Sequence, residues 1–339
     1  MNNSIKKFKE EIENIQIPEK ELQTRIQITI NKTNNKRIEL KRFAYVSSTA
    51  VIILTLLLGS GFVSPVMAEM LSKIPYLRSV LPYTDSGLEV ANEKGLVESI
   101  GQTANDKGIP ITITDVYFDN NRLEVGYMIS LENTDEKDLE GIDILGISKA
   151  DLLINGNDID YTSSAEFNED YVTGTISATE IDLKNLSNTV ELKINVTEAL
   201  GKSGEWIFDL NVEKNEESKI INIEKSVETD VYKFSVNKME VTPSTTKFEY
   251  AFEIPASLKD FNEVALTFNL YNEKGEKFEV IKSGVILHER TKEKTRFSSE
   301  VYFKPIADNT KGLSIVPVIM DESGNSKILT DLKMELTTK

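Results

Sequence analysis

Residues Ile109–Ser130 read IPITITDVYFDNNRLEVGYMIS, and this stretch decides the fold class. Apolar residues alternate with polar ones on both sides of Asp119-Asn120-Asn121, a turn-forming triplet. Alternation with a period of two residues is typical of a strand with one buried face. The stretch therefore predicts a β-hairpin. Its apolar positions are Ile109, Ile111 and Ile113 on one strand and Leu123, Val125, Tyr127 and Ile129 on the next.

Four more segments after this hairpin have the composition of strands. They are Leu152–Ile154, Val172–Ile176, Val190–Val196 and Trp206–Val212. Short alternating strands separated by Asn, Asp and Gly turns favour an immunoglobulin-like β-sandwich, which we assign to residues 109–214. Trp206 is expected to anchor its core.

The second half of the chain repeats this pattern. A shift of 125 residues places Ile109, Ile111 and Val116 on Phe234, Val236 and Val241, and the second strand of the hairpin on Phe248–Ile254. A shift of 123 residues places Val190, Leu192 and Val196 on Leu313, Ile315 and Ile319, and Gly201 on Gly324. The sequence thus predicts a mainly β protein with two tandem sandwiches. The second covers residues 220–338, and the charged run Glu213–Lys219 separates it from the first.

A long apolar segment precedes the sandwiches, in the stretch Lys41–Met70, KRFAYVSSTAVIILTLLLGSGFVSPVMAEM. Residues 43–63 are long and apolar enough for a transmembrane helix, which needs about 20 residues. Basic residues dominate the preceding flank, so the N-terminus is expected in the cytoplasm and the sandwiches outside the cell. The alternative is a secretion signal cleaved after Ala68. Residues 64–108 are expected to form a juxtamembrane stalk and linker. It would contain a short helix, Leu88–Lys94, capped by Asp85, and a linker over residues 96–108.

Residues 1–42 carry the pattern of short amphipathic helices. Ile5, Phe8, Ile12 and Ile15 are spaced as one helix face, and Leu22, Ile26 and Ile30 continue at a spacing of four beyond Pro18. An apolar stripe of this kind binds a partner, lies on a membrane or packs against a copy of itself. The candidate partner-binding residues are Phe8, Ile12, Ile15, Leu22 and Ile26.

Composition narrows the classes of function. The chain contains no Cys, so zinc–thiolate sites and Cys nucleophiles are excluded. Residues 1–42 have a net charge of +4 and the remainder one of −20, which argues against nucleic-acid binding by the exported part. We predict no enzymatic activity, no cofactor and no metal site.

Several residues match patterns found in catalytic or calcium-binding sites, but each has a simpler structural explanation. His288 is the single His and lies in an expected strand without a partner for a catalytic triad. Ser4–Lys7 and Ser244–Lys247 match a Ser-x-x-Lys pattern without its supporting motifs. The acidic turns Asn155–Asp160 and Asp321–Asn325 could supply calcium ligands, but ordinary hairpin turns look the same.

Two motifs in the membrane-proximal region are familiar. Gly59–Pro65 reads GSGFVSP and Lys73–Tyr76 reads KIPY. With the hairpin that follows, they resemble a Gram-positive family of single-pass membrane proteins, the family of unknown function numbered four-one-seven-nine. A second immunoglobulin-like domain of unknown function often follows it. The resemblance covers Met1 to about Ile129 and is less sharp from Ile220 onward.

The resemblance also implies a class of function. Members of the family are often described as anti-sigma factors, because their genes lie beside those of extracytoplasmic-function sigma factors. The implied protein is a membrane regulator in the cell membrane. Its tail would bind a sigma factor, and its exported domains would bind an unknown envelope ligand or protein. The alternative is a structural or adhesive envelope module, anchored or secreted, whose tail serves only insertion.

Overall fold

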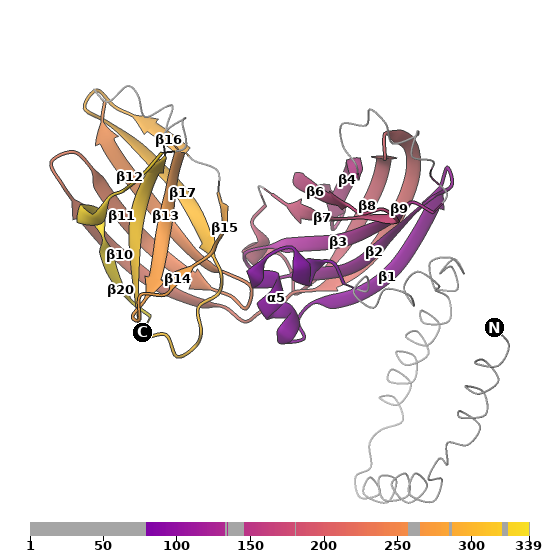
Figure 1. Cartoon of the computed structure of the whole chain (residues 1–339), viewed down its shortest axis with the longest axis horizontal. Coiled ribbons are helices and arrows are strands. Elements are labelled where there is room, and N and C mark those ends of the chain that lie inside the picture. Colours follow the sequence, from indigo (N-terminus) through magenta and orange to yellow (C-terminus); the bar gives the residue numbers. More distant parts are fainter. Residues whose placement is uncertain are drawn as a thin grey trace, which may run out of the picture. The chain divides into compact units, whose positions relative to one another are not determined.

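The computed structural model describes residues 79–132, 134, 146–179, 181–256, 265–284, 287–320 and 325–338, with only the backbone of residues 265, 287 and 288. This part of the chain is mainly β and forms four antiparallel sheets, an arrangement consistent with two sandwich domains (Figure 1). The expected tail over residues 1–42 and the expected span over residues 43–63 lie outside the described residues. Among the described residues, no helix has the length and apolar character that crossing a bilayer demands.

The first domain contains a short helical segment and two sheets. The helical elements are η2 (Leu81–Tyr83), α5 (Ser86–Glu93) and η3 (Leu183–Asn185). One sheet has the order β1-β2-β3-β7-β6 and the other β5-β4-β8-β9. The strands are β1 (Glu98–Asp106), β2 (Ile109–Phe118), β3 (Leu123–Ser130), β4 (Ile147–Ile154), β5 (Asn157–Asp158), β6 (Tyr161–Phe167), β7 (Tyr171–Ala178), β8 (Thr189–Ala199) and β9 (Lys202–Glu213).

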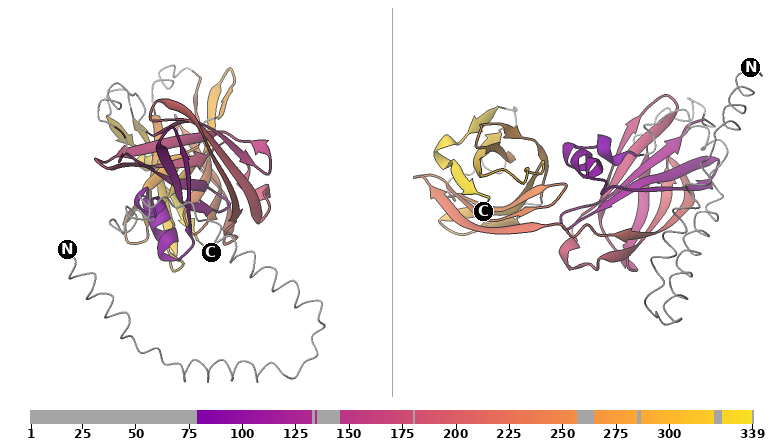
Figure 2. Two further views of the ribbon diagram at one scale, coloured as in Figure 1. Left: turned by 90° about the vertical axis from the view of Figure 1, so that its right-hand side faces the viewer. Right: turned by 90° about the horizontal axis from the view of Figure 1, so that it is seen from below.

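The second domain has a similar strand order. One sheet runs β10-β11-β12-β17-β15, with β16 also paired to β17, and the other runs β14-β13-β18-β19, with β20 also paired to β18. The right-hand view of Figure 2 shows these two sheets as separate layers. The strands are β10 (Lys219–Glu228), β11 (Lys233–Val241), β12 (Thr246–Pro255), β13 (Ala265–Asn272), β14 (Lys277–Phe278), β15 (Val280–Ser283), β16 (Leu287–Arg290), β17 (Lys294–Phe303), β18 (Gly312–Met320), β19 (Ser326–Ile328) and β20 (Met334–Thr337). The short helix η5 (Thr330–Leu332) lies between β19 and β20.

Each domain has its own hydrophobic core between its two sheets. In the first domain, Ile111 and Tyr127 from one sheet and Ile194 from the other belong to one buried cluster. Trp206 is fully buried in this cluster, and its Nε1 donates to the carbonyl oxygen of Ile109 at 2.7 Å. Full burial of such a side chain is worth about 1.5–3 kcal/mol. The prediction that Trp206 anchors a core is therefore confirmed.

The two domains repeat each other with a shift of 123 residues over their first three strands. With this shift, the last pair of the β2–β3 ladder, Phe118 with Leu123, corresponds to the last pair of the β11–β12 ladder, Val241 with Thr246. It also takes the bulge between Ser99 and Gln102 onto the bulge between Asn222 and Lys225. The shift of 125 expected for this hairpin is wrong by two residues, although the expected repeat is present. A slip of two residues leaves every side chain on the same face, so alternation could not detect the error.

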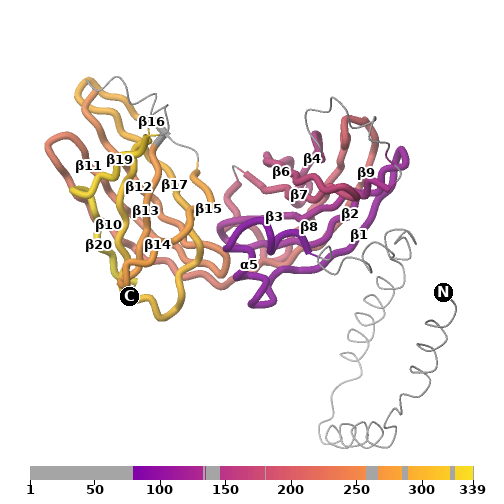
Figure 3. Tube along the Cα trace, in the orientation of Figure 1, coloured from indigo at the N-terminus to yellow at the C-terminus, as the bar shows by residue number. Residues whose placement is uncertain are grey.

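Residues 98–106, which the pattern assigned to a linker, form β1 and pair with β2. This strand is polar and mostly exposed, and its bulge contains Gly101, which interrupts the alternation. It is held by its backbone ladder with β2 and by Ile100 and Ala104, which are partly buried against the core. The tube in Figure 3 follows β1, β2 and β3 side by side. The expected hairpin is confirmed, but both faces of β2 and β3 are buried, not one.

The helix expected at Leu88–Lys94 is present as α5 (Ser86–Glu93), with Asp85 as its N-cap. Gly95, at a φ of +73°, follows its C-cap residue Lys94, as is common where helices end. Leu88 and Ala91 pack with Leu81 and Tyr117 in a small buried cluster. Helix α5 therefore packs against the first domain and is not part of a free stalk.

Candidate functional site

Hydrogen bonds to one carboxylate hold the first described residues, 79–81, against the first domain. Asp115 of β2 is fully buried and accepts hydrogen bonds from the backbone N–H groups of Val80 at 3.2 Å and Leu81 at 3.1 Å. The hydroxyl groups of Ser79 and Thr114 also donate to it. We call Ser79, Val80, Leu81 and Asp115 the latch. It holds residues 79–81, which lie within the stalk and linker expected over residues 64–108, against β2.

The latch depends on a bulge and a glycine. The β2–β3 register shifts between Ile113 and Asp115, which places Asp115 opposite Gly126. A Cβ atom on Gly126 would lie 2.1 Å from Asp115 Oδ1, far inside contact distance. Gly126 therefore leaves the space in which the carboxylate receives the Val80 and Leu81 N–H groups.

The carboxyl group of Asp115 is in an environment that disfavours its charge. Burial raises its pKa above the ordinary value, and the four hydrogen bonds only partly offset this effect. The four donors replace part of the hydration that the carboxyl group loses on burial.

A second buried charge cluster lies next to the latch. The guanidinium of Arg122, whose side chain is only 4% exposed, contacts Asp85 Oδ2 at 2.7 Å and Glu124 Oε1 at 3.1 Å. Asp85 also caps α5, because its Oδ1 accepts from the N–H groups of Gly87 at 2.8 Å and Leu88 at 3.0 Å. We call Asp85, Arg122 and Glu124 the arginine cluster. It ties the helix to the β2–β3 turn.

Electrostatics favours the charged forms of Asp85 and Arg122. Burial opposes ionisation of Asp85, but the Arg122 charge, its hydrogen bonds and the two N–H donors outweigh burial and lower the Asp85 pKa. For Arg122, burial is likewise outweighed by Glu124 and Asp85, so its pKa is raised. Such a cluster is costly to break, because removing one partner leaves an unpaired buried charge.

The turn that carries Arg122 also contacts the second domain. Asp119 Oδ1 accepts from the N–H groups of Asn121 and Arg122, which closes the turn locally. Its Oδ2 accepts from Ser244 Oγ at 2.7 Å, and Asn121 Nδ2 donates to Thr245 Oγ1 at 3.0 Å. The 123-residue shift takes the turn 119–122 onto 242–245, so equivalent turns of the two domains bond to each other.

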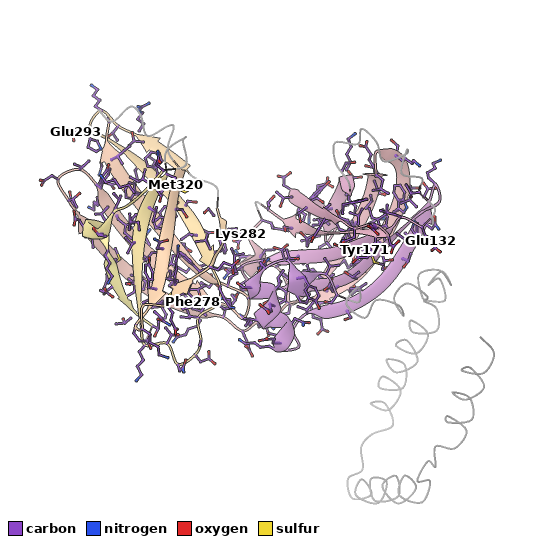
Figure 4. All side chains as sticks on the ribbon, in the orientation of Figure 1. Glu132, Tyr171, Phe278, Lys282, Glu293 and Met320 are labelled. Carbon is purple, nitrogen blue, oxygen red and sulfur yellow. The ribbon has the colours of Figure 1, made fainter. Side chains whose placement is uncertain are left out.

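Further charges border this contact. The fully buried Glu240 lies 2.5 Å from Lys184 of the first domain and 3.5 Å from Lys247 of its own domain. Lys282, labelled in Figure 4, lies on β15 with its Nζ 4.8 Å from the centre of the Tyr302 ring. Burial lowers the pKa of Lys282. We call the contact between the two turns and the Glu240 pairs the junction.

A hollow of about 410 Å³ lies beside the latch. Its lining includes Ser79, Tyr83, Glu166, Tyr171 and Thr175. Figure 4 labels Tyr171 on the first domain. The walls combine hydroxyl groups with the apolar surface of Val80, Ala165 and the tyrosine rings. Among the described residues, no group of three His or acidic side chains is placed to hold a metal ion.

The structure does not test the residues expected to bind a partner. Phe8, Ile12, Ile15, Leu22 and Ile26 lie outside the described residues, as do Ser4–Lys7. Of His288 only the backbone in β16 is described, and of the turn Asp321–Asn325 only its last residue.

Two other segments, which match a Ser-x-x-Lys pattern and a possible calcium-binding turn in the sequence, have ordinary structural roles. Ser244 and Lys247 lie 125 and 123 residues after Asp119 and Glu124, and their side chains serve the junction by bonding to Asp119, Glu240 and Glu300. Asn155–Asp160 contains the turn from β4 to β5, in which Asn155 has a φ of +51°, and β5 itself.

Sequence reasoning missed the latch and most of the arginine cluster. The Asp85 cap was recognised, but its partner Arg122, thirty-seven residues away, was not. The signal available for Asp115 was a carboxylate inside an otherwise apolar strand. A charged residue at such a place needs buried partners, but the sequence does not say which segment supplies them.

These features define a class of protein: a tandem, mainly β, two-domain chain in which residues 79–81 are bonded to the first domain. Residues 36–130 match a domain of unknown function (DUF4179), and residues 218–337 match a family of unknown function (DUF5643). The chain thus carries DUF4179 and DUF5643 domains, and the resemblance named the first of them. The first match begins at residue 36, whereas the resemblance extended to Met1.

A solved structure from Bacillus anthracis has a similar fold. The conserved domain protein from Bacillus anthracis matches with a TM-score of 0.56 and 18% identity, covering 73% of this chain and 93% of that one. Bovine butyrophilin matches with a TM-score of 0.19 and 10% identity over 66% of this chain and 93% of its own. The C-terminal domain of the Streptococcus agalactiae AgI/II polypeptide BspA matches at 0.15 and 8% over 65% and 94%. No curated protein matches the sequence.

Proposed function

We propose that the protein is a single-pass membrane regulator with an anti-sigma-factor role. In this proposal residues 1–42 lie in the cytoplasm and bind a sigma factor of the extracytoplasmic-function type, and residues 43–63 span the cell membrane. The two sandwiches, which we take to be immunoglobulin-like, lie outside and bind an envelope ligand or protein.

The latch is the observation that carries this proposal. Only residues 64–78 separate the proposed span from Ser79, the first residue bonded to Asp115. A change in the exported domains that altered the latch would therefore act close to the membrane helix. The matched DUF4179 region, residues 36–130, includes both the apolar segment and the β2–β3 hairpin, which supports treating the two as one unit.

Flanking charge supports the orientation. Lys36, Arg37, Lys41 and Arg42 precede the apolar segment, and the basic flank of a span stays in the cytoplasm. The proposal is tested by placing one tag at each terminus of the full chain in a Gram-positive host. We expect one full-length membrane species whose C-terminal tag alone is cut by external protease. A secreted fragment beginning at Glu69 would instead show that the segment is a cleaved signal.

Partner binding by the tail is tested with the full-length protein and co-purification of sigma factors. Phe8→Asp with Ile12→Asp places two charges on the apolar stripe and should abolish capture. Asn3→Asp with Asn14→Asp adds the same charge on the opposite face of the expected helix and should leave capture intact. Equal capture by all three proteins would exclude the stripe as the contact surface.

The hollow beside the latch favours a second candidate function, an envelope-anchored structural or adhesive binding module. Its lining, which combines hydroxyl groups with the rings of Tyr83 and Tyr171, suits a hydroxyl-rich polymer. This candidate predicts that deleting residues 2–31 leaves function intact, whereas the regulatory proposal predicts constitutive activity of the sigma factor. A sigma-dependent reporter in the same host distinguishes the two.

A further inference from the structure

Strand β6 is an edge strand without the usual protection against pairing with another chain. It ends the sheet β1-β2-β3-β7-β6, and residues 162–167 are all exposed. Its ladder with β7 runs from Tyr161 to Phe167 without a bulge. The sequence YTSSAEF contains one charge, no Lys and no Pro. Charges, Pro, bulges and short length are the features that normally prevent edge-to-edge pairing.

The other sheet edges in the described part of the chain have such features. β1 and β10 are bulged, and β9 carries Lys202, Glu205, Asp209 and Glu213. The remaining edges are formed by β5, β14, β15, β16, β19 and β20, and each of these has at most four residues. β6 is therefore distinguished from every other described edge by length, regularity and low charge.

The sequence of β6 is complementary to itself in the antiparallel direction. Pairing two copies about Ser164 places Tyr161 opposite Phe167, Thr162 opposite Glu166 and Ser163 opposite Ala165. No like charges face each other in this register. Phe167, a large apolar residue that is 47% exposed, gains an aromatic cross-strand partner at each end of the pairing.

We propose that β6 is a self-association surface, on which a second copy of this chain pairs its own β6 antiparallel about Ser164. The pairing joins the two five-stranded sheets into one continuous sheet. It satisfies the outward-facing backbone groups of β6 in both copies. This inference rests on the first domain alone and does not depend on the sigma-factor proposal.

The first test uses the absence of Cys from the chain. Ser164→Cys introduces one thiol at the centre of the pairing, where the residue faces itself. Directly opposite Cα atoms in an antiparallel pair are about 4.5–5.5 Å apart, within the range of about 4.4–6.8 Å that a disulfide spans. We expect the full-length variant in membranes to form a disulfide-linked dimer on mild oxidation.

The matched control is Ser203→Cys, an exposed serine on the charged β9 edge, which should remain monomeric under the same oxidation. Absence of a dimer with Ser164→Cys, or equal yields from the two variants, would overturn the proposal. Both substitutions replace exposed hydroxyls by thiols of similar size, so the fold is retained.

The second test checks the register at one position. Thr162→Lys places a cation opposite Glu166 of the other copy and should strengthen dimerisation, whereas Thr162→Glu should weaken it about tenfold. Combining Thr162→Glu with Glu166→Lys should restore the dimer. Sedimentation of the full-length protein in detergent measures the dissociation constants. Equal effects of Lys and Glu at residue 162, or none, would exclude this register.

Discussion

Gly101 and Glu224 occupy the same position in equivalent bulges of the two domains. Gly101 lies in the β1 bulge with a φ of +68°, and Glu224 lies in the β10 bulge with a φ of +47°. They are separated by the same 123 residues that relate the rest of both hairpins. The bulge is thus repeated, although only one of the two copies has kept the residue type best suited to it.

Replacing Glu224 by Gly should stabilise the second domain by about 0.5–1 kcal/mol. A left-handed backbone costs an L-residue about 1–2 kcal/mol, and Gly avoids this cost. The greater entropy of Gly in the unfolded state offsets part of the stabilisation. Gly101→Glu should destabilise the first domain by a similar amount. Chemical denaturation of the full-length protein measures both changes, and a destabilising Glu224→Gly would contradict the equivalence.

The latch predicts a specific cost for Asp115→Asn. An amide can accept through one oxygen only, so either Val80 N–H or Leu81 N–H loses its partner, at a cost of about 1–3 kcal/mol for a buried donor. Amide hydrogen exchange should accelerate at residues 79–84 and remain unchanged in the second domain. If these amides exchange at the same rate in the variant as in the wild type, Asp115 does not hold the segment.

The latch also predicts a pH dependence. The folded pKa of Asp115 is raised, so its contribution to stability is fully present below the unfolded value of about 3.8 and declines as pH rises through the folded value. Asn does not titrate. The difference in unfolding free energy between wild type and Asp115→Asn should therefore shrink with rising pH across this window. Denaturation curves at several pH values measure it, and a constant or growing difference would contradict this assignment.

The arginine cluster predicts a large effect for Arg122→Gln and the opposite pH trend. Removing the guanidinium leaves the Asp85 and Glu124 carboxylates unpaired and should destabilise the first domain by about 3–5 kcal/mol. In wild type the pKa of Asp85 is lowered, so its contribution is present above the unfolded value and lost as pH falls through the folded value. Arg122→Gln should remove that loss. Thermal unfolding against pH checks both statements, with the exposed Arg290→Gln as the control.

The junction predicts energetic coupling between the domains. Lys184 and Glu240 lie on different domains, 2.5 Å apart, with Glu240 fully buried. A double-mutant cycle with Lys184→Met and Glu240→Gln should give a coupling energy of about 1–3 kcal/mol. The same cycle on the exposed pair Lys193 and Asp209 should give less than about 1 kcal/mol. Additive effects at Lys184 and Glu240 would mean that the junction carries no such coupling.

The parts of the fold visible in the sequence were those with strong local patterns. The β2–β3 hairpin, α5 with its Asp85 cap and the buried Trp206 all follow from alternation, capping chemistry or residue type. β1 and β6 were missed because they are edge strands. Most of their residues are polar or exposed, and the few that pack against the core, Ile100, Ala104 and Tyr161, do not alternate regularly.

By itself, the sequence determined that this chain is mainly β, that it is built from two repeated domains and that one apolar segment precedes them. These properties depend on composition and on periods of two to four residues. Only the tertiary structure decided the 123-residue register, the bonding of Asp115 to residues 79–81 and the pairing of Arg122 with Asp85. Each of these joins residues that are far apart in the chain. Packing in three dimensions determines which residues become partners. The local sequence pattern does not predict these partners.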